Sequence, residues 1–137
     1  MPGHPVADFF TLSYEEFLQR AFHDPERFRV DPASLPEQAQ KAMAANREAL
    51  ATYTGHQMSD PGLAEKLGTL EVPTLVLWGE SDKVAEPDYG RAYAASIPMA
   101  RFEILSGAGH LPQVEKSAET MAAIWDCADT DFKQRSK

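Results

Sequence analysis

The sequence is poor in cysteine, in basic residues and in long apolar runs. Cys127 is the only cysteine among 137 residues, so no internal disulfide can form and a reducing compartment is the natural expectation. Thirteen Lys and Arg stand against 21 Asp and Glu, which gives a formal charge of −8. Such a chain repels phosphates, so we expect neither nucleic acid nor an anionic membrane surface as a partner.

Signals for targeting, membrane insertion and metal binding are lacking as well. Residues 1–5 have neither the basic region nor the apolar stretch of a signal peptide. The most apolar run, Val72–Trp78, is far shorter than the ~20 residues that cross a bilayer. We therefore expect a cytoplasmic protein with no membrane association. His4, His23 and His56 are scattered without metal-ligand spacing, so no metal and no other cofactor is expected.

The first half of the chain, residues 1–68, has a helical pattern. Ser13 and Glu16 form a capping box, and the apolar residues behind them recur at helical spacing. A second capping box, Ser34 to Glu37, predicts a long helix that ends near Thr54. The apolar stripe of this helix is thin, which is typical of a helix that lies over a cavity; it comprises Ala39, Met43, Asn46, Leu50 and Tyr53. A short helix with leucines at 63, 67 and 70 follows.

The second half, residues 69–137, changes period. Val72–Gly79 is a continuous apolar run, which is how a strand buried on both faces of a parallel sheet appears. A helix over Pro87–Ser96 and a second strand over Arg101–Leu105 follow, and Ser117 can cap a final helix with an apolar face. Strand, helix, strand, helix predicts an α/β fold with a right-handed parallel crossover.

An acid and an imidazole follow the two predicted strands. Asp82 lies just beyond the first strand and His110 just beyond the second, 110 − 82 = 28 residues later. The carboxyl ends of neighbouring parallel strands lie at one edge of a sheet, so these side chains are expected to meet there. A carboxylate in that place can hold an imidazole in one tautomer and stabilise its protonated form. Gly107 and Gly109 allow the backbone angles that turn the imidazole into a cleft.

These residues carry a resemblance to a known family. Thr69–Asp82 is similar to the penultimate strand and acid loop of the α/β-hydrolase fold, and Gly107–Pro112 is similar to its histidine loop. Residues 8–62 are similar to the helical cap that this family inserts before that strand. The resemblance implies a cap-like segment over residues 1–68 and the C-terminal part of the hydrolase core over residues 69–137. It also implies that Asp82 is the acid and His110 the general base of a catalytic triad.

The nucleophile of that family is missing from the sequence. It sits in a G-x-S-x-G elbow upstream of the acid and the histidine, and none of the serines here has that context. The eight serines stand at positions 13, 34, 59, 81, 96, 106, 117 and 136. Ser81 and Ser106 lie near the acid and the histidine, but turn roles suit both better. Without a nucleophile and oxyanion donors, the pair has no alcohol to activate.

A sheet of two strands leaves the first strand with a bare edge, which invites pairing with another chain. We therefore expect an obligate partner, with self-association through that edge. Three interpretations remain open. The chain is the C-terminal part of a hydrolase for an ester-like or related small apolar substrate and is inactive alone; or it is a non-catalytic, self-associating module; or it is one half of a split hydrolase completed by a separate G-x-S-x-G chain.

Several other side chains have less specific interpretations. Glu80 and Lys83 are expected to be solvated, and so is the pair Glu115 and Lys116. Four phenylalanines of the first half are expected to pack in a core, with the lining of an apolar pocket as the alternative; they are Phe9, Phe10, Phe17 and Phe22.

Overall fold

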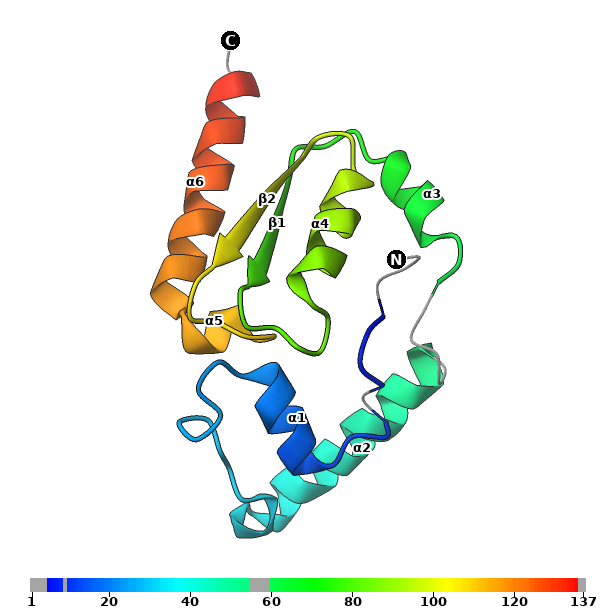
Figure 1. Cartoon of the computed structure of the whole chain (residues 1–137), viewed down its shortest axis with the longest axis vertical. Helices are drawn as coiled ribbons and strands as arrows, with labels where there is room; N and C mark the ends of the chain where they lie inside the picture. Colours follow the sequence, from blue (N-terminus) through cyan, green and yellow to red (C-terminus); the bar gives the residue numbers. More distant parts are fainter. Residues whose placement is uncertain (1–4, 9, 55–59, 136–137) are drawn as a thin grey trace.

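The structure is a computed structural model, and it describes residues 5–8, 10–54 and 60–135 (Figure 1). Helices and strands alternate in the second half, so the predicted α/β class is confirmed. The elements in chain order are α1 (Tyr14–Ala21), the 3-10 helix η1 (Pro32–Ser34), α2 (Glu37–Thr54), α3 (Leu63–Gly68), β1 (Thr74–Gly79), α4 (Pro87–Ala95), β2 (Ala100–Leu105), α5 (Pro112–Glu115) and α6 (Ser117–Arg135).

The two strands form a parallel sheet that runs in register from Thr74 opposite Ala100 to Gly79 opposite Leu105. The crossover helix α4 and the last helix α6 flank the sheet on either side (Figure 1). The buried core lies between the sheet, α3 and α4, and its buried members are Leu67, Val76, Ala94 and Ile97. Trp78 adds its indole, whose Nε1–H donates to the carbonyl of Ala85 at 2.9 Å.

Helix α1 begins where the first capping box predicts. The Glu16 carboxylate accepts from the backbone N–H of Ser13 at 2.9 Å, and the Ser13 hydroxyl accepts from the N–H of Glu16 at 3.3 Å. The apolar stripe behind the box buries Leu18 and Ala21 almost completely. This helix therefore packs through its last turn, which is the end that approaches the sheet in Figure 1.

The predicted start of α2 is wrong. Ser34 does not cap this helix but ends η1, where its hydroxyl donates to the carbonyl of Asp31 at 2.7 Å. The reason is Pro36, because a residue that precedes proline avoids helical angles and Leu35 is extended. The helix begins at Glu37 and ends at Thr54 as expected. None of its residues is buried, and Tyr53 of the predicted stripe is 89% exposed.

The last helix carries the predicted apolar face, but the described residues leave that face open. Met121, Ile124 and Trp125 are between 46% and 63% exposed. The short helix α5, which the sequence did not predict, turns the chain from β2 into α6.

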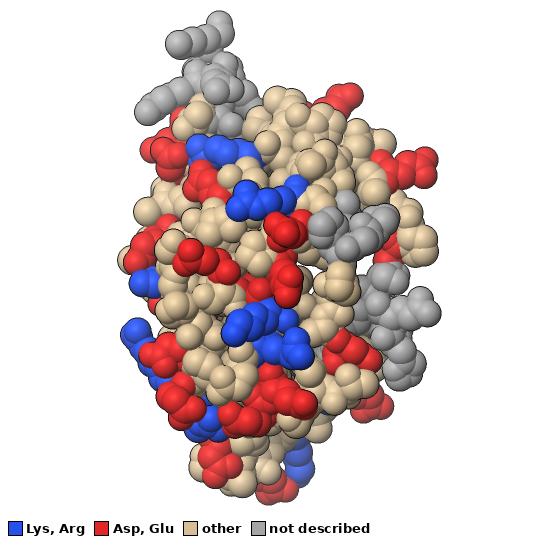
Figure 2. Space-filling view, in the orientation of Figure 1, with Lys and Arg blue, Asp and Glu red and all other residues tan. Residues whose placement is uncertain are grey.

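Acidic and basic side chains lie interspersed on the face shown in Figure 2. Two arginines each form ion pairs with two carboxylates: Arg29 with Glu15 and Glu26, and Arg101 with Glu103 and Asp126. None of the helices in the described part of the chain has the length and apolar character needed to cross a membrane.

Candidate active site

The two strands end level with each other, because Gly79 pairs with Leu105 at the last position of the register. Two hydrogen bonds then hold the following loops together beyond the sheet. The N–H of Glu80 donates to the carbonyl of Leu105 at 3.0 Å, and the N–H of Ser81 donates to the carbonyl of Ala108 at 2.8 Å. The acid loop and the histidine loop therefore lie side by side at the carboxyl edge of the sheet, where ligands of open α/β sheets bind.

Asp82 is 4% exposed and uses both of its carboxylate oxygens. Oδ1 accepts from the N–H of Val84 at 2.8 Å and from the N–H of Ala85 at 3.0 Å. Oδ2 lies 2.9 Å from Nδ1 of His110. The two backbone donors orient the carboxylate, so that its second oxygen is aimed at the imidazole.

The structure thus brings the two predicted site residues together. An ionised carboxylate only accepts hydrogen bonds, so Nδ1 of His110 carries the proton and Nε2 is left with its lone pair. The His110 side chain is 37% exposed, while that of Asp82 is almost fully enclosed. A buried carboxylate behind a half-exposed imidazole can hold its tautomer and orient Nε2 toward a substrate.

Glycines allow the two loops to approach this closely. Gly107 has a φ of +69°, the left-handed conformation that the sequence led us to expect. Gly109 is needed for a different reason than predicted. A Cβ on it would lie 2.3 Å from the carbonyl oxygen of Ala21, and a Cβ on Gly79 would lie 2.0 Å from the carbonyl oxygen of Gly109. These positions admit no side chain unless the backbone moves.

The last turn of α1 contacts both loops. The carbonyl of Arg20 accepts from the N–H of Lys83 at 3.0 Å, and the carbonyl of Ala21 accepts from the N–H of His110 at 2.7 Å. Carbonyls at the end of a helix have no partner within the helix, so they are free to bind such donors. The first helix of the predicted cap-like segment therefore helps to fix the site, and the domain boundary after residue 68 stays a prediction.

The expectation that Glu115 is a solvated surface residue is wrong, whereas Glu80 is exposed as expected but also accepts a hydrogen bond. Glu115 is half-buried, and its carboxylate accepts from the N–H groups of Gly109, His23 and Asp24 at 2.5, 2.8 and 3.2 Å. Glu80 accepts from the N–H of Gly107 at 3.3 Å. Sequence reasoning missed both because these donors come from other loops, and no local spacing signals such a contact.

Ser81 is occupied within the site as well. Its hydroxyl lies 2.8 Å from Nδ1 of His23, the exposed residue that follows the end of α1. This contact adds a second link between α1 and the acid loop. It supports the structural role expected for Ser81 over that of a replacement nucleophile.

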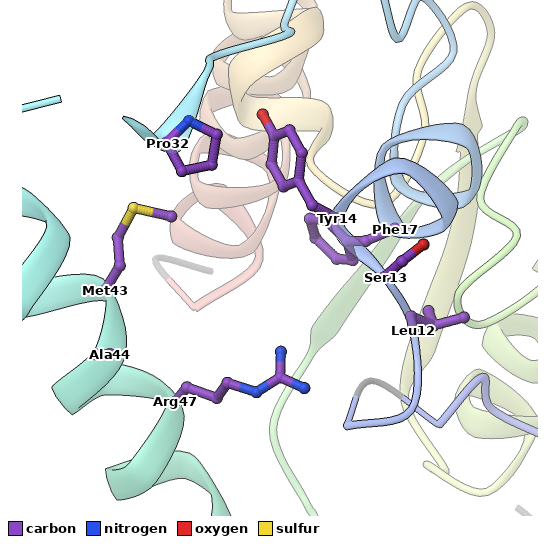
Figure 3. A pocket seen from close by; sticks show the side chains of 8 residues that line it. All are labelled: Leu12, Ser13, Tyr14, Phe17, Pro32, Met43, Ala44 and Arg47. Carbon is purple, nitrogen blue, oxygen red and sulfur yellow. The ribbon is translucent and has the colours of Figure 1, made fainter. Parts of the chain in front are cut away.

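A mostly apolar cavity of about 350 Å³ opens between α1 and α2 (Figure 3). Tyr14 and Phe17 of α1 face Met43 and Arg47 of α2 across it, and Leu12, Ser13, Pro32 and Ala44 complete the lining. The cavity beside α2 agrees with the thin apolar stripe of that helix. Phe17 lines this cavity, so for this phenylalanine the structure favours the alternative, the lining of an apolar pocket, over core packing.

The other three phenylalanines differ in their surroundings. Phe22 stacks on Phe28 with ring centroids 5.1 Å apart, and Phe10 lies beneath the Arg47 guanidinium at 5.9 Å. Phe9 lies outside the described residues. Within the described ranges, no group of three or more His, Cys, Asp or Glu side chains is arranged to hold a metal ion.

Comparison with known proteins agrees with this geometry. The family model of the alpha/beta hydrolase fold matches residues 11–117, so the chain belongs to that family. It is 31% identical over 96 residues to a 2-hydroxy-6-oxononadienedioate/2-hydroxy-6-oxononatrienedioate hydrolase of Cupriavidus pinatubonensis, covering 64% of this chain and 33% of that protein. It is 28% identical over 95 residues to Lipase 3 of a Moraxella species, covering 65% of this chain and 30% of that protein.

The fold is similar to that of a solved thermophilic esterase from Thermogutta terrifontis. The TM-score is 0.64 at 29% sequence identity, and the match covers 85% of this chain but 42% of the esterase. The chain thus spans about a third of the length of the curated relatives and less than half of this solved structure.

Proposed function

We propose that this chain supplies the acid, Asp82, and the general base, His110, of a catalytic triad in an alpha/beta hydrolase. The nucleophile would come from a G-x-S-x-G segment outside the present sequence. The observation that carries the proposal is the 2.9 Å contact between Oδ2 of the buried Asp82 and Nδ1 of His110. Family membership supports it, because the matched range, residues 11–117, includes both residues and the sequence around each resembles the acid loop and the histidine loop of that family.

In this mechanism Nε2 of His110 takes the proton of the serine hydroxyl as the serine attacks the substrate carbonyl. Asp82 stays ionised, holds the tautomer through Nδ1 and stabilises the imidazolium that forms. The imidazolium then protonates the leaving group, and a water molecule activated by the same Nε2 releases the acyl group. The chain alone lacks the alcohol for the first step, so we expect it to be inactive by itself.

An ester-like or related small apolar substrate suits the described residues best. The cavity between α1 and α2 is lined mainly by apolar and aromatic side chains, with Arg47 as its charged member. The three relatives bear the names of hydrolytic enzymes: a lipase, an esterase and a 2-hydroxy-6-oxononadienedioate/2-hydroxy-6-oxononatrienedioate hydrolase. The choice among these substrates depends on parts of the fold that this chain does not include.

The proposal is tested by supplying the missing segment. DNA sequencing upstream should reveal a stretch that encodes G-x-S-x-G, and its polypeptide is co-produced with the 137-residue chain. The assembly should then hydrolyse a p-nitrophenyl ester and react with a fluorophosphonate probe. His110→Ala and Asp82→Asn should each lower the turnover on the order of 10⁴-fold, because base or tautomer control is lost.

Two results would contradict the proposal. One is fluorophosphonate labelling of the isolated chain that His110→Ala abolishes, since a nucleophile would then lie within these residues. The other is an assembly whose esterase turnover is unchanged by His110→Ala. As a control we suggest Lys41→Ala, which removes an exposed side chain of α2 whose ion pair is with Glu37 of the same helix.

A non-catalytic, self-associating module is the second candidate. The observation that favours it is the edge of β1, which pairs with β2 on one side and with no other strand among the described residues. The upstream sequence separates the candidates, because a missing G-x-S-x-G segment would exclude both the fragment and the split enzyme.

A further inference from the structure

One carboxylate ties together three segments that are distant in sequence. Oε2 of Glu115 accepts from the N–H of Gly109, the residue before His110, at 2.5 Å. Oε1 accepts from the N–H groups of His23 and Asp24 at 2.8 and 3.2 Å. Glu115 thus joins α5, the histidine loop and the chain that leaves α1.

A second contact closes this arrangement into a ring. The chain that leaves α1 follows directly on Ala21, whose carbonyl accepts from the N–H of His110 at 2.7 Å. The two consecutive amides of Gly109 and His110 are therefore held from two sides, one by Glu115 and one by the end of α1. Glu115 also binds the backbone just beyond Ala21, so it stabilises both contacts: its own with the Gly109 amide and that of the Ala21 carbonyl with the His110 amide.

The local sequence explains why the Glu115 carboxylate lies against the histidine loop that precedes it. Pro112 opens the single turn of α5, and the N–H of Glu115 donates to the carbonyl of Leu111 at 3.2 Å. This turn reverses the chain after His110 and brings the fifth residue beyond the histidine against the loop it has just left. Backbone N–H groups that would otherwise lack partners are strong donors to a carboxylate.

We propose that Glu115 is a positioning residue that holds His110 on Asp82 by fixing the histidine loop against the end of α1. The imidazole can keep its 2.9 Å contact with Asp82 only while the backbone at residues 109 and 110 stays in place. The Glu115 carboxylate does not touch the imidazole, and it acts through the Gly109 amide. The inference gives this glutamate a role within the proposed hydrolase site and rests on that proposal for its catalytic meaning.

The test measures the contact itself. In the 137-residue chain with ¹⁵N-labelled histidine, the Nδ1–H of His110 should give a downfield proton resonance, assigned by its absence in His110→Gln. Glu115→Ala removes both oxygens, and we expect this resonance to be lost. Glu119→Ala is the matched control, since Glu119 lies near Glu115 but pairs with Lys116 at 3.8 Å, and it should leave the resonance in place.

A second pair of variants separates positioning from general stabilisation. Leu67→Ala removes a buried side chain of the core under α4, so it should lower the stability of the chain yet keep the resonance. Glu115→Gln keeps the size of the side chain but leaves one acceptor oxygen. This oxygen can accept either from Gly109 or from the amides that follow α1, but not from both. We expect a weakened resonance for this variant, and it decides the matter if Glu115→Ala does not fold.

A His110 Nδ1–H resonance of unchanged position and intensity in a folded Glu115→Ala chain would overturn the inference. The same resonance unchanged in Glu115→Gln would overturn it as well, and so would its loss in a Leu67→Ala chain that circular dichroism shows to be folded. The measurement needs no nucleophile. A failed esterase test therefore contradicts the proposed function alone, and an unchanged resonance contradicts the role of Glu115 alone.

Discussion

At the scale of single residues, Gly79 shows how little space the site leaves. A Cβ at this position would lie 2.0 Å from the carbonyl oxygen of Gly109 and 2.7 Å from that of Ala108. Both atoms belong to the backbone of the histidine loop, so neither can move aside as a flexible side chain would.

We therefore predict that Gly79→Ala separates the histidine loop from the acid loop. Overpacking of this kind typically costs about 1–3 kcal/mol in the free energy of unfolding. The His110 Nδ1–H resonance should be lost as well, because the loop carries the imidazole. Urea unfolding followed by circular dichroism measures the first effect, and NMR measures the second.

Gly68→Ala is the matched control for this prediction. Outside its chain neighbours and the nearby backbone of α3, the nearest atom to a Cβ on Gly68 would be the carbonyl oxygen of Ser96, at 4.0 Å. Since alanine is favoured over glycine in a helix, this variant should be equally stable or more stable by up to about 1 kcal/mol. Equal stability of Gly79→Ala and the unaltered chain would show that the loops are not packed as described.

At this scale, the sequence predicted that Asp82 and His110 lie together, but it did not predict the contacts of Glu115 with the histidine loop. Asp82 and His110 could be found because each follows a parallel strand, and parallel strands deliver their carboxyl ends to one edge. Glu115 could not, because its partners depend on where α1 comes to rest. In the sequence, Glu115 beside Lys116 has the same appearance as any solvated ion pair.

At the scale of the elements, the guanidinium of Arg29 connects α1 to the segment that follows this helix. Nη1 and Nη2 of Arg29 bind the two carboxylate oxygens of Glu15 at 2.5 and 2.9 Å, and Arg29 also binds Glu26. The hydrogen bonds from Arg29 lower the pKa of Glu15 from 4.5 to about 2.

The sign of this shift predicts a pH-dependent contribution to stability. A carboxylate whose pKa is lowered in the folded state stabilises the fold above its unfolded pKa, near 4.5, and loses that effect as the pH falls toward 2. Glu15→Gln should therefore lower the urea midpoint at pH 7 by a small amount, since the pair is exposed to solvent. Near pH 2 the variant and the unaltered chain should converge.

Glu48→Gln is a suitable control, because Glu48 is exposed on α2 and forms no ion pair with another described residue. It should leave the urea midpoint unchanged at both pH values. A Glu15→Gln midpoint that differs equally from that of the unaltered chain at pH 7 and at pH 2 would contradict an electrostatic origin.

Element boundaries were predictable where short-range contacts decide them. The capping box of Ser13 and Glu16 acts within one turn, and α1 starts as expected. The start of α2 failed because two local signals competed, a serine cap and the proline that follows two residues later. Pro36 keeps Leu35 extended and so excludes Ser34 from the helix. The apolar face of α6 is uncovered among the described residues, because periodicity predicts that a helix has such a face but not what packs against it.

At the scale of the whole molecule, β1 has one edge without a neighbouring strand among the described residues. The N–H groups of Thr74 and Glu80 both donate toward β2, to Met99 and Leu105. Because donors alternate along a strand, the N–H of the odd-numbered Leu77 points to the opposite edge. That edge has no strand beside it in the described part of the chain, so its donors can pair with a second copy.

We expect the isolated chain to self-associate through this edge, with a native mass above the 15.1 kDa of one copy. Leu77→Pro removes the outward donor without touching the ladder to β2, so it should shift the mass to that of a monomer. Leu77→Ala is the matched control, since it loses the same side chain but keeps the N–H and should still associate. Native mass spectrometry or light scattering gives the masses. A monomeric unaltered chain, or a Leu77→Pro chain that associates as before, would show that association does not use the backbone of β1.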